Sequence, residues 1–452
     1  APAERPTRLA IVDIDEPSLA EVGRWPWGRD RLAQLVDVLF AQQRIAALGF
    51  DLVFAEPDPG ELPMLAALAS GDPALAAQLP RLQRELDRDA RFSRALQGRA
   101  VVLANYFTGD RAGARYGKLP PSLGPLPGPA AASLPRWDGY GASLPLLADA
   151  AQHGGFINAL PDADGVLRSA ALVGAFDGQL YESLALAVWR LAGGAPVPRL
   201  QQTADGRLLT GLEIGGHVFT TDDHGRVLIP YRSRGGPQSG AFERVPAADL
   251  LAGRVAPGRL AGYRVLVGTS VPALADLRPT PIHAALPGVE VHASLLAGLD
   301  TGRLPARPDW ARGYEASLLV LLGLGMALSL RRLSSGHATL LCAALLVGLL
   351  LGHEWAWRAH GLALPMASAL LLLATGYAVA MAWGYLVEGR SRRLLTRLFG
   401  SYVPPQLVRR MASDPQHYAR AALEADNREL TLLFCDLRDF TTLSEHLEQI
   451  GR

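Results

Sequence analysis

The sequence has little cysteine. Its two cysteines, Cys342 and Cys435, lie in separate apolar segments and are not placed to pair with each other. The first 300 residues contain none, which excludes a disulfide framework for the large N-terminal part of the chain. A location outside the cytoplasm stays open, because a domain of that length can build a sufficient hydrophobic core without disulfides.

The chain also lacks a dominant charge. Its formal net charge is +1 at pH 7 over 452 residues, so no bulk electrostatic attraction favours nucleic acid or an acidic partner. Nearly all the positive charge is carried by arginine, with Lys118 as the exception. A chain of this length exceeds one ordinary domain, and two or three structural units are expected.

Charge is missing altogether from three stretches, which are residues 314–330 after Glu315, residues 333–352 and residues 362–387. Each is long enough, or nearly so, to cross a hydrocarbon core of about 30 Å at about 1.5 Å per residue. One such run could be a buried core helix, but three in succession favour three transmembrane helices in a lipid bilayer. Tryptophans stand at the ends of the runs, as interfacial anchors do: Trp310, Trp355, Trp357 and Trp383.

Arginines around these runs predict the orientation of the chain. Arg331 and Arg332 follow the first run, and a cluster of arginines at 390–397 follows the third. With three crossings these two sites share one side, which the positive-inside rule makes the cytoplasm. We therefore expect a multi-pass protein of the plasma (bacterial inner) membrane, with residues 8–307 in the periplasm or outside the cell. Export of that part requires a further span or signal ahead of Ala1.

Residues 8–307 are predicted to form an α/β domain. The apolar run 9–14 is typical of a parallel strand, residues 30–47 carry leucines and valine at helical spacing, and the second half of 45–54 is again strand-like. This succession is a βαβ unit. Further elements are predicted with strands at 100–106, 166–176, 227–230 and 264–268, helices at 181–191 and 291–299, and long loops over 116–147.

Five residues of this domain are candidates for contact with a sensor ligand: Asp15, Trp25, Trp27, Arg29 and Asp51. They lie near or within the first two predicted strands, and ligands of α/β sheets bind at strand ends. Each also has a structural alternative: Asp15 as a helix cap, the tryptophans as a plug at the sheet edge, and Arg29 as an ion-pair partner of Asp51.

The histidines and a short acidic turn give no metal-site pattern. His153, His283 and His292 lack metal-ligand spacing, and we interpret them as structural. The sequence DADG at 162–165 resembles the start of a calcium loop, but without the remaining ligands it predicts a β-turn.

A second candidate site lies near the end of the chain. Residues 430–435 are almost continuously apolar and predict a buried strand that ends on Asp436. Thr442 and Glu445 have capping-box spacing, so a helix is expected to begin there. A carboxylate at a strand end beside a helix N-terminus suits a metal–phosphate site, although such an aspartate alone is more often a cap or turn residue.

Two resemblances give these patterns a family context. The sequences RLFGSYVPP at 397–405 and ELTLLFCDLRDFT at 429–441 resemble the entry to a class III adenylate/guanylate cyclase domain. The sequences IDEPSL at 14–19, GRWPWGR at 23–29 and GFDLVF at 49–54 resemble a CHASE2 sensor domain. The implied order is a sensor, three spans at 314–387, a coupling segment at 388–427, and at 428–452 the truncated start of an α+β, ferredoxin-like cyclase domain.

The cyclase resemblance implies specific roles. Asp436 matches the first of two metal-binding aspartates, the carbonyl of Leu437 would be a further ligand, and Phe440 and Thr441 would hold the triphosphate through backbone N–H groups. Two ions, Mg²⁺ or Mn²⁺, would activate the ribose 3′-hydroxyl and neutralise the leaving pyrophosphate. The expected reaction is ATP to cyclic AMP, with ATP preferred to GTP, in a homodimer. Asp439 departs from the family's usual glycine.

Since one aspartate does not complete a two-metal site, residues 1–452 alone are expected to be inactive. Two alternatives remain. A diguanylate cyclase also places an aspartate after its first strand, often in D-x-D-x-F, whereas here Asp436 and Asp439 are separated by two residues. Alternatively, the cyclase-like end is degenerate and the protein is a non-catalytic membrane sensor.

Overall fold

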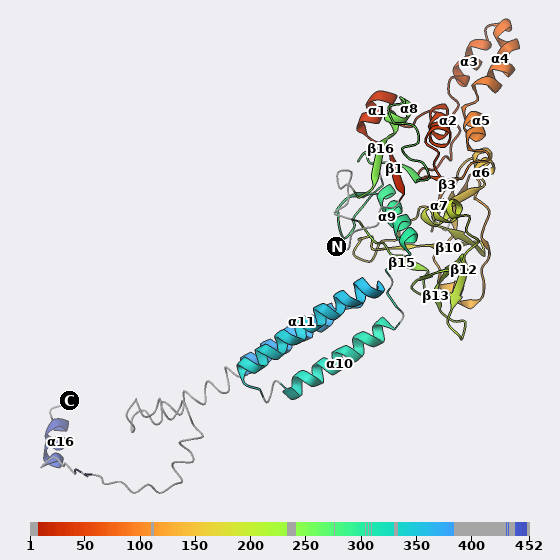
Figure 1. The fold of residues 1–452 in the computed structure, drawn as a ribbon. Coiled ribbons are helices and arrows are strands. Elements are labelled where there is room, and N and C mark those ends of the chain that lie inside the picture. Colours follow the sequence, from red (N-terminus) through yellow and green to blue (C-terminus); the bar gives the residue numbers. More distant parts are fainter. Residues whose placement is uncertain are drawn as a thin grey trace. The chain divides into compact units, whose positions relative to one another are not determined.

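The computed structural model describes residues 8–109, 113–232, 241–274, 276–302, 304–305, 307–308, 310–329, 333–383, 431, 433 and 439–449. The chain divides into two compact units, one made of residues 1–324 and 343–372, the other of residues 325–342 and 373–452. The α/β domain lies in the first unit (Figure 1). The predicted α/β class is confirmed.

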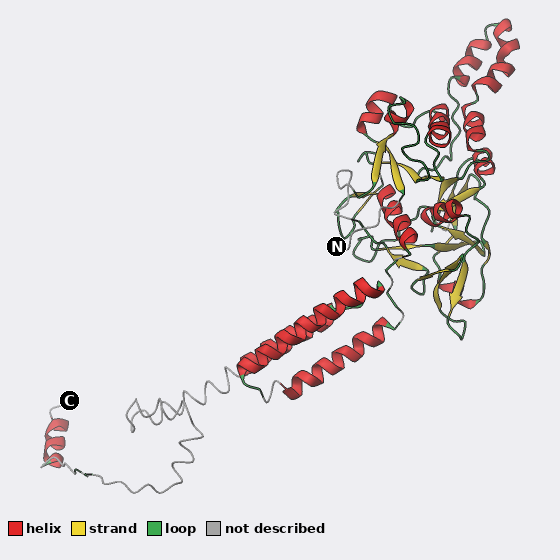
Figure 2. Cartoon of the chain, in the orientation of Figure 1, coloured by secondary structure: helices red, strands yellow, loops and turns green. Residues whose placement is uncertain are grey.

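A mainly parallel sheet is the centre of this domain (Figure 2). Strands β16, β1, β17, β2, β3 and β8 run parallel to their neighbours, and β7 is antiparallel to β3. Their bounds are β16 (Glu243–Pro246), β1 (Leu9–Ile14), β17 (Arg264–Thr269), β2 (Ala47–Phe50), β3 (Val101–Thr108), β8 (His153–Phe156), β7 (Gly139–Gly141) and β4 (Arg115–Tyr116).

Strand β1 shows why this sheet is apolar throughout. Leu9 and Ile11 belong to one buried cluster, whereas Ala10, Val12 and Ile14 belong to another. Because successive side chains of a strand point to opposite faces, both faces of the sheet are covered.

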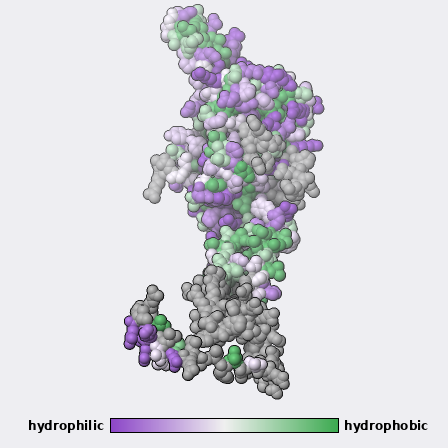
Figure 3. Space-filling model, turned by 90° about the vertical axis from the view of Figure 1, so that its left-hand side faces the viewer, coloured by the Kyte–Doolittle hydropathy of each residue, from purple (hydrophilic) through white to green (hydrophobic). Residues whose placement is uncertain are grey.

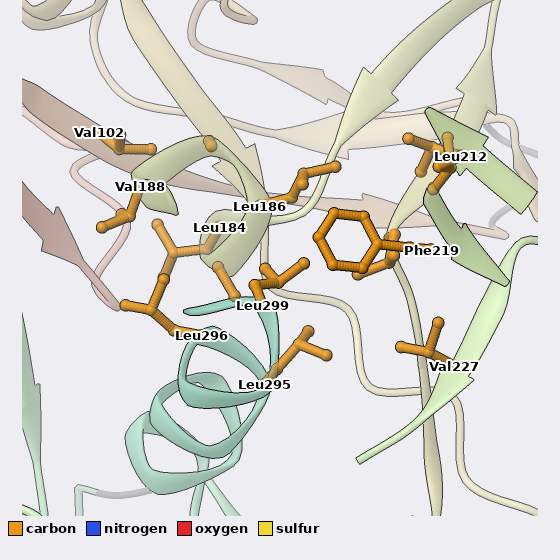
Figure 4. Packing of buried hydrophobic residues seen from close by; sticks show 14 of the residues in the cluster. Val102, Leu184, Leu186, Val188, Leu212, Phe219, Val227, Leu295, Leu296 and Leu299 are labelled. Carbon is orange, nitrogen blue, oxygen red and sulfur yellow. The ribbon is translucent and has the colours of Figure 1, made fainter. Parts of the chain in front are cut away.

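Helices cover the two faces. Helices α7 (Leu184–Gly193) and α9 (Gly288–Thr301) pack on one face, and Figure 4 shows their leucines gathered together, with Phe219 from a smaller sheet nearby. The other face is covered by α2 (Arg29–Asp37), α5 (Arg88–Leu96), α6 (Pro145–Ala151) and α8 (Ala247–Leu251), and α8 also contacts α1 (Glu16–Val22). The sheet is thus a three-layer α/β core.

The predicted βαβ unit needs three corrections. The helix expected over 30–47 ends as α2 and a π-helical turn, Val38–Gln42, and β2 already begins at Ala47. Strand β2 ends at Phe50, so Asp51 follows the strand instead of lying inside it. In addition, β17 lies between β1 and β2. Such a long-range insertion leaves no local pattern in the sequence.

Smaller sheets account for most other differences. The stretch 116–147, predicted as loop, contains β5 (Gly124–Pro125), a 3₁₀ turn (Pro129–Ser133), β6 (Arg136–Trp137) and β7. The helix predicted from residue 181 begins at Leu184, because Gln179–Glu182 form β11 beside β10 (Val173–Phe176). The remaining strands are β9 (Ser169–Ala171), β12 (Arg199–Gln202), β13 (Leu209–Ile214), β14 (His217–Thr220), β15 (Arg226–Leu228), β18 (Leu277–Arg278) and β19 (Leu286–Pro287).

A helical hairpin was not expected from the sequence. Helices α3 (Leu62–Ala69) and α4 (Pro73–Leu86) contact each other and extend away from the sheet (Figure 1). Met64 and Leu68 are exposed there, and the tip of the domain carries hydrophobic surface in Figure 3.

Three apolar helices follow the α/β domain: α10 (Ala311–Ser329), α11 (Ser335–His360) and α12 (Ala367–Trp383). By length and composition, two could cross a membrane, at Ala311–Ser329 and Gly336–His360. The second predicted span, 333–352, is too short at its C-terminal end, because α11 continues to His360. The described part of α12 has 17 residues, and the predicted end of the third span lies outside the described residues.

Two polar contacts join these helices. Ser368 Oγ of α12 donates to Glu315 Oε1 of α10 at 2.5 Å. Thr339 Oγ1 of α11 and Tyr377 Oη of α12 lie 3.0 Å apart. Hydrogen bonds of this kind satisfy polar groups that would otherwise face an apolar environment.

The C-terminal segment is described in small part. Helix α16 (Phe440–Gln449) confirms a helix after the apolar stretch, but it begins before the expected cap at Thr442. Of the predicted buried strand, only Thr431 and Leu433 are described; both are exposed and neither is in a strand. Within the described residues no strand pairs with Thr431 or Leu433, so the predicted burial is not observed there.

Candidate ligand-binding cavity

A cavity of about 120 Å³ lies at the carboxyl ends of strands β2, β8 and β17. Its lining includes Asp51 after β2, Ile157 after β8 and Thr269 at the end of β17. The first two turns of α9 form another wall, with Gly288, which is the first residue of that helix. Ligand sites of open α/β sheets occur at this edge.

Asp51 is held here by the main sheet. Its backbone N–H donates to the carbonyl oxygen of Val267 at 2.9 Å, which fixes the residue beside β17. Its side chain is 13% exposed. Burial, and then repulsion from Asp276, raises the pKa of the Asp51 carboxyl group to about 8. The carboxyl group therefore keeps its proton at neutral pH.

His292 faces Asp51 from α9. Its Nε2 atom lies 3.6 Å from Asp51 Oδ1, which is longer than a hydrogen bond. Burial lowers the pKa of the imidazole to about 4. The distance would suit an ion pair, but both pKa shifts oppose charge, and the desolvation of both groups makes the neutral pair the stable state at neutral pH.

The rim of the cavity carries an ion pair. Arg278 of β18 donates to Asp276 through Nε at 2.9 Å and Nη2 at 2.5 Å. The carbonyl oxygen of Asp276 also accepts a 3.0 Å bond from the N–H of Gly288. This segment thereby connects the rim to the N-terminus of α9.

Two more polar residues line the cavity and differ in their bonding. The side-chain amide of Asn158 is already hydrogen-bonded: it accepts from Phe107 N at 2.8 Å and donates to Phe107 O at 2.7 Å. Ser183 precedes α7 and is 3% exposed. In the described part of the chain its hydroxyl group has no hydrogen-bond partner. It is thus an available donor and acceptor.

Of the five predicted sensor residues, Asp51 alone lines this cavity. Asp15 caps α1, where its Oδ1 accepts from Ser18 N at 2.9 Å, so the structural alternative is confirmed. Trp25 and Trp27 pack edge to face with ring centroids 5.9 Å apart, and both lie against the cluster on the α2 face. The tryptophans therefore belong to the opposite side of the sheet from α9.

The alternative pairing of Arg29 with Asp51 is wrong. Arg29 begins α2 and lies 3.5 Å from Asp89 of α5, with its guanidinium 4.5 Å from the ring centre of Phe54. Its backbone N–H donates to Asp58 at 2.8 Å. These contacts are all on the face covered by α2 and α5, which separates Arg29 from the cavity.

The other sequence predictions have clear outcomes. The turn at 162–165 is confirmed by the hydrogen bond from Gly165 N to Asp162 O at 2.8 Å. Arg168 forms ion pairs with both Asp162 and Asp164. His283 accepts from Ala285 N in its own loop. His292, interpreted as structural, lines the cavity instead.

Sequence reasoning missed a buried ion network next to the cavity. Arg244 of β16 pairs with Asp13 of β1 at 2.9 Å and with Glu290 of α9. Both carboxylates are nearly inaccessible, and Ser270 N also donates to Asp13 at 2.9 Å. This network fixes α9 to the strand ends, on which the position of His292 depends.

The cyclase-like residues cannot be assembled into a site. Asp436 and Leu437 lie outside the described residues. Phe440 and Thr441 are the first two residues of α16 and are exposed.

An α/β domain with a ligand-sized cavity, followed by helices apolar enough to span a membrane, has the layout of a membrane sensor. Residues 2–329 match the CHASE2 domain, and the chain belongs to this family. The match extends beyond the predicted boundary at 307 and includes α10. No curated protein and no solved structure matches the chain.

Proposed function

We propose that this protein is a membrane-bound sensor cyclase, in which the CHASE2 domain controls the conversion of ATP to cyclic AMP and pyrophosphate. The sensor half follows from the family. The cyclase half is supported by the motif at residues 429–441 and by one feature of the backbone within it.

That feature is the conformation of Asp439. Its φ angle is +63°, in the left-handed region that favours glycine. This is the position where the cyclase pattern usually has glycine, and aspartate is among the few other residues that tolerate the conformation. The sequence difference at Asp439 therefore leaves the backbone of the motif intact, which favours a working turn over a degenerate one.

The start of α16 directly after this turn also fits phosphate binding. Phe440 and Thr441 stand in its first turn, where backbone N–H groups have no partner inside the helix. Asp436 and the carbonyl of Leu437 would hold a divalent ion, Mg²⁺ or Mn²⁺. In the complete site two such ions would activate the ribose 3′-hydroxyl and neutralise the pyrophosphate.

The location and assembly are part of the same proposal. With three spans, and with the arginines after the first and third on the inner side, the cyclase end would lie in the cytoplasm and the CHASE2 domain outside. Cyclases of this class complete their sites across two subunits, so the functional unit is a homodimer. ATP is the preferred substrate over GTP.

The test uses membranes carrying the protein as its gene encodes it. With ATP and Mg²⁺ or Mn²⁺ we expect cyclic AMP, and an Asp436→Ala variant expressed at the same level gives none above background. Formation of cyclic di-GMP from GTP would establish the diguanylate cyclase alternative. Equal nucleotide turnover in both preparations, or none, would contradict the proposal.

A further inference from the structure

Three polar groups in the cavity lack the hydrogen bonds that buried polar groups normally make. Within the described chain, the Asp51 carboxyl and the His292 imidazole accept or donate no hydrogen bond, and their nearest approach is 3.6 Å. The buried Ser183 hydroxyl has no partner either. Because a fully buried hydroxyl group is nearly always satisfied in folded proteins, Ser183 indicates a bound polar guest, and Asp51 and His292 line the same cavity.

Apolar side chains form much of the remaining lining, and the volume of the cavity limits the size of that guest. Phe156, Leu274 and Leu295 contribute to the walls. A cavity of about 150 Å³ holds benzene in another protein, so the cavity of about 120 Å³ here suits roughly six non-hydrogen atoms. The guest is therefore a short molecule with one polar end and one aliphatic end.

The charges select the polar end. The lining has two carboxylates, Asp51 and Asp276, against one imidazole and one guanidinium. Arg278 already forms an ion pair with Asp276. Asp51 is thus the carboxyl group of the lining without a cationic partner, and with Arg278 paired the described lining offers an anionic guest no free cation.

We propose that this cavity binds a small aliphatic amine in its ammonium form, held by the Asp51 carboxylate. An ammonium group has three N–H donors and no acceptor. Asp51 and the neutral imidazole of His292, 3.6 Å apart, offer two acceptors to one ammonium group, and the hydroxyl of Ser183 belongs to the same lining. The aliphatic part of the amine packs against Leu274 and Leu295.

Binding is coupled to release of a proton. The empty cavity keeps Asp51 protonated up to a pKa of about 8, so the amine displaces this proton to solvent. His292 stays neutral above a pKa of about 4, and Asp276 and Arg278 at the rim form their own pair. Affinity therefore rises with pH, on the order of twentyfold between pH 6 and 7.5.

The cavity is well placed to affect the membrane helices. Gly288, Val291 and His292 line it from α9, which ends at Thr301, and α10 begins at Ala311. This inference deepens the sensor part of the proposed function and rests on it. Direct binding distinguishes the two, because loss of amine binding with cyclase activity intact would contradict the amine site alone.

The experiment is calorimetric titration of the full protein in detergent with isobutylamine, isobutanol and isobutyrate at pH 7.5. We expect binding of the amine with one site per chain, at least tenfold weaker binding of the alcohol, and none of the acid. Equal affinity for amine and alcohol, preference for the acid, or no binding of the amine at millimolar concentration would overturn the proposal.

Two variants test the place of binding. Asp51→Asn should reduce amine affinity at least tenfold and abolish its pH dependence. Should it fail to fold, Gly288→Ala serves, because the added methyl would lie 3.5 Å from Asp51 Oδ2, an ordinary contact that occupies the site. We expect it to weaken binding severalfold with an unchanged melting temperature. Asp149→Asn, at an exposed pair with Lys118, is the control, and unchanged affinity in both site variants would refute the assignment.

Discussion

Asp51 Oδ1 and His292 Nε2 lie 3.6 Å apart at the edge of the parallel sheet, and burial disfavours charge on both side chains. The two pKa shifts have opposite directions. Between about pH 4 and pH 8 the carboxyl group keeps a proton that it would lose in water, and the imidazole lacks one that it would gain below pH 6.5. The pair is therefore polar but uncharged at neutral pH.

The first prediction concerns the proton on Asp51. In infrared difference spectra of the full protein, a protonated-carboxyl band should persist at pH 7 and disappear with an apparent pKa of about 8. Asp51→Asn should remove this band, whereas Asp149→Asn should retain it. A carboxyl band that disappears near pH 4 would contradict the assignment.

The second prediction is the effect of this proton on stability. The folded-state pKa of Asp51 is raised from 3.8 to about 8, so its contribution is full below pH 4 and is lost as pH rises to 8. At about 1.4 kcal/mol per unit, the free energy of unfolding relative to Asp51→Asn should fall by about 2 kcal/mol between pH 6.5 and 8. Denaturant unfolding followed by tryptophan fluorescence measures this difference.

His292 gives the opposite sign and an internal control. Its folded-state pKa is lowered to about 4, so its contribution is present above pH 6.5 and is lost as pH falls to 4. Relative to His292→Gln, the protein should therefore lose stability on acidification. If the unchanged protein instead gains stability relative to His292→Gln as the pH falls, the imidazole is charged in the folded state.

The third prediction concerns the ion network of Arg244. Arg244→Met removes the arginine that pairs with the buried carboxyl groups of Asp13 and Glu290, and removal of one member of a buried network costs about 3–5 kcal/mol. Arg254 also pairs with two carboxylates, Glu21 and Asp249, but at the surface. Arg254→Met should cost far less, because ion pairs at the surface contribute little to stability. Similar losses in the two variants would show that burial of the Arg244 network is not what stabilises it.

The sequence predicted those parts of the fold that depend on local patterns. The apolar run of β1, the amphipathic α2 and the three charge-free runs all correspond to elements of the structure. It did not predict that β17 pairs between β1 and β2, since that contact joins segments more than 200 residues apart. Pairing at such distances depends on tertiary packing, which propensities do not encode.

The candidate site was predictable to the same extent. Asp51 could be chosen because it is a carboxylate in the second strand-like segment of the chain. His292 and Ser183 could not, because each lies in a helical or loop segment whose distance from Asp51 is set only by the packing of α7 and α9. Asp15 follows a strand and Arg29 ends a motif of the sequence, so both were equally reasonable choices. In the structure the carboxylate of Asp15 caps α1, and the guanidinium of Arg29 forms an ion pair with Asp89.

The fourth prediction tests the membrane orientation. Ser334 lies between α10 and α11, and Ala363 lies between α11 and α12. In a background with Cys342 and Cys435 replaced by serine, Ser334→Cys should be modified by a membrane-impermeant thiol reagent only after the cell is opened. Ala363→Cys should be modified in intact cells whose outer envelope is permeable to the reagent. The reverse pattern would contradict the positive-inside assignment, and modification of both residues in intact cells would contradict a crossing by α11.

The fifth prediction separates backbone from charge at Asp439. Its φ of +63° costs most side chains about 1–2 kcal/mol, but aspartate, asparagine and glycine tolerate it. When these variants are made in the full-length protein and assayed in membranes, Asp439→Gly and Asp439→Asn should therefore retain cyclic AMP formation. Both should also lower the KM for ATP, because they remove a negative charge from the predicted phosphate site.

Asp439→Val should lower kcat several-fold, since a β-branched residue resists the left-handed conformation on which the start of α16 depends. If Asp439→Val is as active as the unchanged protein, the turn at Asp439 does not position the nucleotide. If both Asp439→Asn and Asp439→Gly lower activity, the carboxylate has a role that the cyclase resemblance does not assign.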